Sequence, residues 1–114
     1  MEKLSRPKMI CKMIHGDKQA IRDGLLSDNP YLRIDALLWI AYHHMNLPEL
    51  IEKIHELKND DSQIMGYTVS SHAIATLDAL GIEEYNGNDQ YQKALNANIV
   101  PTKEQAEAFL LKYQ

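Results

Sequence analysis

Residues 28–45, DNPYLRIDALLWIAYHHM, are the stretch that decides the fold. Asn29 is a favourable N-cap, and Pro30 occupies the first helical turn, where no backbone N–H is needed. The side chains that follow leave almost no polar face, so this stretch is predicted to be a buried helix with other helices packed on several of its sides. It is too short, and with Arg33 and Asp35 too polar, to span a bilayer.

The rest of the chain supplies the covering helices. Apolar side chains recur at helical spacing on both sides of the buried stretch, and no segment shows the alternation of a strand. Thr102 with Gln105 three residues later predicts a capping box, and Gly81 suits the position just after a helix. We therefore expect an all-α chain of about seven helices that forms one domain over residues 1–114. The other helices are predicted at about residues 8–15, 17–26, 48–57, 62–80, 89–96 and 102–113.

The composition is that of a globular domain, with 45% of the 114 residues hydrophobic and 25% charged. No apolar run near the start resembles a secretory signal, and none is long enough for a transmembrane span, so the cytoplasm is the expected compartment. The single cysteine, Cys11, lies on an apolar helical pattern. We expect it in the core or at its edge rather than as a reactive thiol.

Charge is distributed unevenly along the chain, whose net charge is −4. Residues 1–22 carry a balance of +4, residues 23–92 a balance of −9, and residues 93–114 a balance of +1. The acidic middle would repel nucleic acid and membrane surfaces and would speed encounter with a basic protein. The simpler alternative is that these surface acids only keep the protein in solution.

A repeat emerges when the chain is shifted by 32 residues. Asp28 then aligns with Asp60, and Leu32 aligns with Ile64. Each unit reads as an amphipathic helix, a short Asp/Asn turn and a more buried helix. One such pair cannot bury its apolar face alone, so the pairs are expected to stack into an α–α superhelix.

The first unit resembles a known family. Residues 26–37, LSDNPYLRIDAL, are similar to the turn and second helix of a HEAT repeat. That pattern places Asp in the turn, then an aliphatic residue followed by Arg, then a small residue on the packed face. The matching residues here are Asp28, Leu32, Arg33 and Ala36. The resemblance implies antiparallel helix pairs in which the turn Asp and the helix Arg of neighbouring repeats interact.

The resemblance covers residues 17–81 and weakens in the second unit. Met65 stands where the HEAT pattern has Arg, and Thr68 stands where it has a small residue. A continued ladder of Asp–Arg contacts is therefore not implied. The alternative architecture is an irregular all-helical bundle.

Few residues stand in arrangements that catalysis or metal binding requires. His43 and His44 are adjacent, so on a helix they diverge by about 100°. The other histidines lie on separate predicted helices, and no metal site is expected. Ser70, Ser71 and His72 are sequence neighbours that do not face one another on a helix, and we interpret them as packing and surface residues. The glycines are scattered, without a phosphate-binding loop.

Asp35 interrupts the buried helix and has two interpretations. A buried carboxylate needs a partner, so Asp35 could be a catalytic or ligand-binding acid. The structural interpretation pairs it with a basic residue of a neighbouring helix or places it at a solvated helix edge, and we favour this one. We expect no catalytic residues, no cofactor and no bound metal.

These observations predict a non-catalytic module that binds a basic protein. In fold, size and charge the chain resembles bacterial immunity proteins of polymorphic toxin systems, which neutralise a cognate toxin by direct contact. The resemblance implies that an acidic surface covers a cationic site, for example that of a nuclease toxin. The candidate partner-binding residues are Glu49, Glu52, Glu56, Asp60, Asp61, Glu83, Glu84 and Asp89.

Two other functions stay open at this point. The chain could be an adaptor or scaffold subunit of a larger assembly. HEAT-like DNA glycosylases form a third class, but they are larger and hold the duplex on a basic concave surface, and this chain lacks both features. The oligomeric state is not predicted, because a superhelix capped only by short helices could stack on a second copy.

Overall fold

A computed structural model describes residues 4–114 of the chain. Within that range the protein is all-α, as predicted, with seven helices and one small hairpin of two-residue strands. The helices are α1 (Arg6–Ile14), α2 (Lys18–Leu25), α3 (Pro30–His43), α4 (Pro48–Leu57), α5 (Val69–Ala79), α6 (Gln90–Asn98) and α7 (Lys103–Tyr113). The strands are β1 (Gln63–Ile64) and β2 (Tyr67–Thr68).

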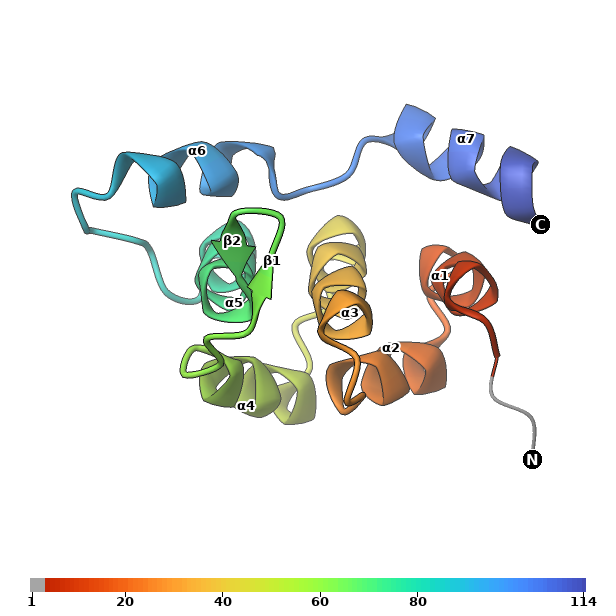
Figure 1. Cartoon of the computed structure of the whole chain (residues 1–114), viewed down its shortest axis with the longest axis horizontal. Coiled ribbons are helices and arrows are strands. Elements are labelled where there is room, and N and C mark those ends of the chain that lie inside the picture. The colour runs from red at the N-terminus through yellow and green to blue at the C-terminus, as the bar shows by residue number, and fades with distance from the viewer. Residues whose placement is uncertain (1–3) are drawn as a thin grey trace.

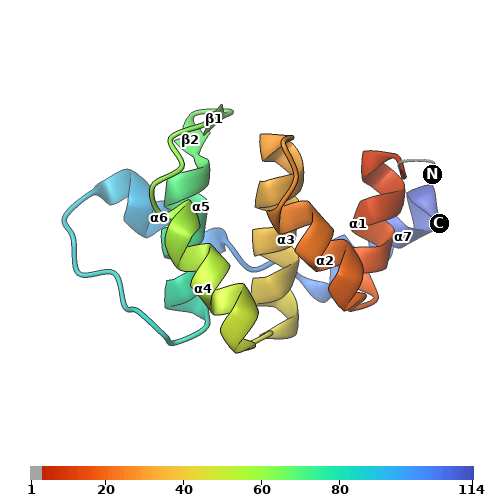
Figure 2. The same cartoon turned by 90° about the horizontal axis from the view of Figure 1, so that it is seen from below.

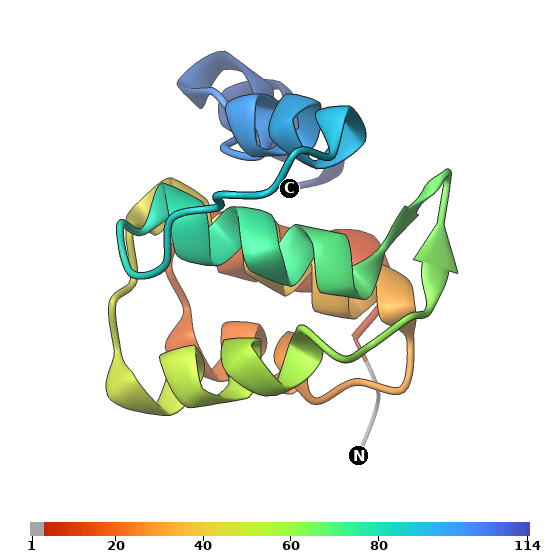
Figure 3. The same cartoon turned by 90° about the vertical axis from the view of Figure 1, so that its left-hand side faces the viewer.

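The helices lie in three layers (Figure 1). α2 and α4 form one outer layer, α1, α3 and α5 form the middle layer, and α6 and α7 run across the opposite face. Figure 3 shows the three layers one above another, with α4 and α5 seen from the side, and Figure 2 shows α2 and α4 from the outside, in front of the middle helices. The molecule measures 41 × 29 × 27 Å along its principal axes. α5 is therefore covered from both sides, by α4 and by α6.

The helix starts follow from local sequence. Asp17 Oδ1 accepts a hydrogen bond from the backbone N–H of Ala20 at 3.1 Å, and Asn29 caps α3. The predicted capping box at α7 is confirmed, because Thr102 and Gln105 bond to each other's backbone N–H groups. These side chains satisfy N–H groups that have no partner inside the helix.

α3 is the buried helix that the sequence predicts. Seven of its residues are buried, and α1, α2 and α5 pack against it. α2 approaches α3 closely at Gly24, where an added Cβ would lie 3.1 Å from the Cβ of Ala36 and 2.5 Å from the terminal methyl of Met13. Gly24 weakens the α2 helix intrinsically, but it permits this close contact between the two layers.

The prediction of one helix from Ser62 to Leu80 is wrong in its first part. A β-hairpin occupies the start of this segment, and α5 begins only after the N-cap Thr68. The chain turns at Met65 and Gly66, whose φ angles are 51° and 92°. Positive φ at both central residues is the geometry of a two-residue hairpin loop of type I′, which no helix accommodates. Thr68 then caps the backbone N–H of Ser71 at 3.0 Å, which fixes the later helix start.

The hairpin also breaks the 32-residue repeat. Thr68, the N-cap of α5, follows Asn29, the N-cap of α3, by 39 residues. The first helices of the two pairs, α2 and α4, still stand in corresponding places in the outer layer. One contact expected between the units is present: Nε of Arg33 lies 2.9 Å from Oδ2 of Asp60 as an ion pair, although it is not aligned as a hydrogen bond. Arg33 also donates to the backbone oxygen of Ser27 at 2.8 Å.

No helix among residues 4–114 combines the length and the apolar character that a membrane crossing needs.

Replacing Met65 tests the strain in the hairpin. Met65 adopts a left-handed conformation that costs an ordinary L-residue about 1 kcal/mol or more, and its side chain is 89% exposed, so it contributes little packing. Met65→Asn should therefore raise the free energy of unfolding by about 0.5–1 kcal/mol, measured by urea denaturation with far-UV circular dichroism. Gly66→Ala is the control and should lower it, because the φ of 92° at Gly66 disfavours a Cβ. A less stable Met65→Asn variant would contradict this account.

Candidate functional site

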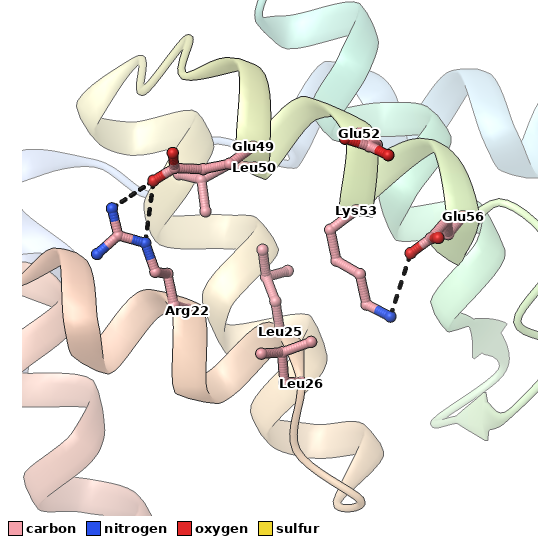
Figure 4. Close-up of a pocket in the computed structure, with 8 residues that line it drawn as sticks. All are labelled: Arg22, Leu25, Leu26, Glu49, Leu50, Glu52, Lys53 and Glu56. Atoms are coloured by element: carbon pink, nitrogen blue, oxygen red, sulfur yellow. Dashed lines mark hydrogen bonds and ion pairs between the residues drawn. The ribbon is translucent and has the colours of Figure 1, made fainter.

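A groove between α2 and α4 is the candidate binding site, and it opens on the outer layer (Figure 4). Its cavity volume is about 520 Å³, within the range of pockets that bind ligands. Both helices and Leu26, the residue after the end of α2, contribute side chains to it. The lining residues are Arg22, Leu25, Leu26, Glu49, Leu50, Glu52, Lys53 and Glu56.

Three leucines form the apolar part of the groove. Leu25 and Leu50 are 1% and 2% exposed, because they also belong to the core beneath α2 and α4. Leu26 follows the last residue of α2 and is 66% exposed. A large aliphatic side chain with this exposure beside two buried leucines provides a surface that a partner side chain could cover.

Three glutamates on α4 form the acidic edge of the groove, which we call the α4 rim: Glu49, Glu52 and Glu56. Their spacing of three and four residues puts them on one face of α4, while Leu50 faces the core. Oε1 of Glu49 accepts two hydrogen bonds from Arg22 of α2, the one from Nε at 3.0 Å. Oε2 of Glu56 pairs with Lys53 at 3.3 Å. Glu52 makes no ion pair within residues 4–114.

The other predicted partner-binding acids are spread beyond the groove. Asp60 lies beside Arg33, and Glu83 pairs with Lys58 at 2.6 Å. Asp89 caps α6 by accepting from the backbone N–H of Tyr91 at 2.9 Å. The structure therefore brings three of the eight predicted acids together at one groove and gives several of the others structural contacts. Asp61 and Glu84 are exposed.

Two of these acids have shifted pKa values. Burial raises the pKa of Asp60, but hydrogen bonds from Ser62 and the charge of Arg33 outweigh it, so the pKa lies below the usual value. A hydrogen bond from Lys58 lowers the pKa of the exposed Glu83. Ionised Asp60 therefore stabilises the fold above the usual carboxyl pKa, and this contribution is lost as the pH falls through the lowered pKa. At neutral pH the carboxylates of Asp60 and Glu83 are therefore ionised and already paired, with Arg33 and with Lys58.

Sequence reasoning identified the acids of the groove but missed its cations and leucines. Arg22 and Lys53 neutralise much of the α4 rim, and Leu26 gives the groove its exposed apolar surface. The sequence does indicate the pairing of Lys53 with Glu56, since a Lys and a Glu three residues apart face one another on a helix. The contact of Arg22 with Glu49 joins two helices 27 residues apart in sequence, and no local pattern indicates it.

Asp35 pairs with a basic residue of a neighbouring helix, as the structural interpretation predicted. Its two carboxylate oxygens accept hydrogen bonds from Nε and Nη2 of Arg6 on α1, at 2.7 and 2.9 Å. Burial raises the pKa of Asp35, and the hydrogen bonds and charge of Arg6 offset only part of that rise. The guanidinium also lies over the ring of Tyr31, 5.2 Å from its centroid. The Asp35 carboxylate thus ties α1 to α3.

Two histidines, His43 and His72, make structural contacts. Nε2 of His43 lies 2.9 Å from the backbone oxygen of Met13, and Nδ1 of His72 lies 3.0 Å from that of Thr68. Burial lowers the pKa of His72, which favours the neutral ring. Among residues 4–114, no three His, Cys, Asp or Glu side chains are grouped closely enough to hold a metal ion. Cys11 is a buried free cysteine, as predicted.

Comparisons of this chain with protein-family models, with curated proteins and with solved structures gave no match.

Breaking the Arg6–Asp35 pair tests its structural role. Arg6→Met leaves a buried carboxylate without its donors and should lower the free energy of unfolding by about 1–3 kcal/mol in chemical denaturation at neutral pH. The double variant Arg6→Met/Asp35→Leu should recover most of this loss, because it removes the buried charge together with its partner.

The pH dependence distinguishes this explanation from lost packing at Arg6. Without Arg6 the pKa of Asp35 rises further, so folded Arg6→Met binds the proton more tightly than the unfolded chain does. Its stability then falls as the pH increases from the usual carboxyl value of 3.8 through the raised pKa. The deficit relative to the unchanged protein should be smallest in acid. A deficit that is equal at all pH values would contradict the ion-pair explanation.

Proposed function

We propose that this chain is a non-catalytic, cytoplasmic protein-binding module built from HEAT-like helix pairs, and that it binds a basic protein through the α2–α4 groove. The observation that carries the proposal is the α4 rim: three carboxylates on one helix face, next to exposed apolar surface. Acidic and apolar groups side by side are typical of surfaces that select a cationic protein partner.

The α4 rim keeps carboxylate oxygens that can accept hydrogen bonds from a positively charged partner. Oε1 of Glu49 and Oε2 of Glu56 are engaged by Arg22 and Lys53, which leaves one oxygen of each carboxylate free of those contacts. Glu52, between them, has no ion pair within the described residues. A carboxylate oxygen accepts more than one hydrogen bond, so the rim retains capacity for the donors of Lys or Arg side chains.

The finer proposal is that the partner is a toxin domain, for example a nuclease, and that this protein is an immunity protein that inhibits it. The small size and the acidic middle of the chain favour this reading, since covering a cationic active site would block the toxin. The alternative is an adaptor subunit, which would also bind protein but would not protect cells from a toxin. A neighbouring gene that encodes a large protein with a C-terminal toxin domain would favour the inhibitor.

Affinity capture from native lysate tests the proposal. The tagged protein should recover one stoichiometric basic protein at low salt and lose it at about 0.5 M salt, where charges on the surface are screened. Glu52→Lys in the groove should abolish this recovery, and Glu52 makes no ion pair within residues 4–114, so the fold should be kept.

The matched control is Glu104→Lys on α7, which changes the net charge equally on the opposite layer and also breaks no ion pair among the described residues. It should bind as the unchanged protein does. Recovery of a large assembly that is indifferent to salt and to both variants would overturn the proposal and favour the adaptor. Recovery that the two variants reduce equally would place binding away from the groove.

A further inference from the structure

We infer that the α2–α4 groove binds an amphipathic α-helix of the partner, with basic side chains one turn apart on the α4 rim and an aliphatic side chain against Leu26. This inference rests on the proposed function and adds to it the secondary structure and register of the bound segment. It follows from three properties of the groove: what its backbone offers, how its carboxylates are spaced, and where its apolar surface lies.

The backbone of the groove favours a helix over a β-strand as occupant. Its walls are the helices α2 and α4, most of whose N–H and C=O groups bond within their own helices, so the groove offers no sheet edge. A bound strand would need partners for its own backbone groups, and such peptides normally pair with an exposed sheet edge. A helix satisfies its backbone internally and needs only side-chain contacts. The groove therefore suits a helix.

The spacing of the α4 rim sets the register of that helix. Glu49, Glu52 and Glu56 follow one another at three and four residues, so the row is about 10 Å long, with roughly 5 Å between neighbours. Lys or Arg residues at the same spacing on a facing helix would meet one carboxylate each. Glu52 is the central member and lacks an ion pair within residues 4–114, so it should contribute most to attraction.

The apolar surface lies beside the rim, on the α2 side of the groove. Figure 4 shows Leu25 and Leu26 on the α2 side, across from the glutamates of α4, and Lys53 directed to its partner Glu56. Leu26 is 66% exposed, whereas Leu25 is buried beneath it. An aliphatic residue on the facing helix, adjacent to its basic row, would cover Leu26. The expected partner helix is therefore basic on one stripe and aliphatic on the next.

One helix of this chain has a related pattern. Lys8 and Lys12 lie one turn apart on α1, Leu4 lies just before the helix, and all three are exposed. A second copy of the chain could therefore offer α1 to the groove. The opposite face of α1 is buried in its own core, so such a contact would join two folded molecules. This occupant is an alternative that the test must separate.

The probe is a synthetic helical peptide of about 15 residues with three Lys at the spacing of the rim and a Leu on the adjoining face. Its binding to the full chain is measured by fluorescence anisotropy. Two control peptides have Glu in place of Lys, or the same composition in an order without helical periodicity. The periodic basic peptide should bind at least about tenfold more tightly than either control, and less tightly as salt increases.

Matched variants locate the site. Glu52→Gln and Leu26→Gln should each lower the affinity for the peptide at least about fivefold. The first variant removes the central charge of the rim, and the second removes the exposed apolar contact. Glu104→Gln and Leu111→Gln make the same changes on α7, where Leu111 is 89% exposed, and should leave affinity unchanged. Equal affinity for the scrambled peptide, or no effect of Leu26→Gln, would overturn the inference.

The outcomes separate this inference from the proposed function. If capture from lysate yields a basic protein that depends on Glu52 but not on Leu26, and the peptide fails, the function stands and the helical occupant is wrong. If no basic protein is captured, the function fails whatever the peptide does. Sedimentation of the full chain adds the third outcome: concentration-dependent self-association that Leu26→Gln removes would assign the groove to a second copy.

Discussion

The whole structure depends on covering α3. This helix has almost no polar face, so the hydrophobic effect requires other elements on nearly every side of it. α2 approaches through Gly24, α5 packs in the same layer, and α1 closes the third side. The one carboxylate in its buried surface, Asp35, is tolerated because Arg6 of α1 donates to both its oxygens. The order of layers follows from these contacts.

The features predicted correctly from sequence are those that neighbouring residues determine. Asn29 with Pro30 starts α3, and Thr102 with Gln105 starts α7, because each cap needs only the next turn of the chain. The hairpin was missed because Ile64 precedes the apolar stripe of the following helix and reads as its first member. Gly66 and the capping Thr68 decide the local backbone instead. A single glycine in a helical pattern is a weak signal, and here it marks a turn.

How the third layer packs on the middle layer could not be predicted from the sequence, for a different reason. α6 buries only Gln92, which donates to the backbone oxygen of Ser71 on α5, and Asn96 of α6 donates to Asp78. Polar contacts of this kind have no periodic signature, so the helix could be predicted but its docking surface could not. The candidate site shows the same limit. The excess of acidic residues in the middle of the chain pointed to its glutamates. The contact between Arg22 and Glu49 joins residues 27 apart, and no sequence pattern indicates it.

The return of α7 to α1 changes how the molecule should fold. Stacked helix pairs normally contact only their neighbours, so a terminal pair can open while the rest stays folded. Here the last helix packs on the first, and Nε2 of His15 lies 2.6 Å from Oε1 of Gln114, 99 residues away in sequence. Closing so long a loop costs only slightly more entropy than closing a short one, yet it joins both ends of the stack. α7 thereby covers core residues of the first helix, so losing either terminal helix exposes the core at the other, which favours unfolding as one cooperative unit.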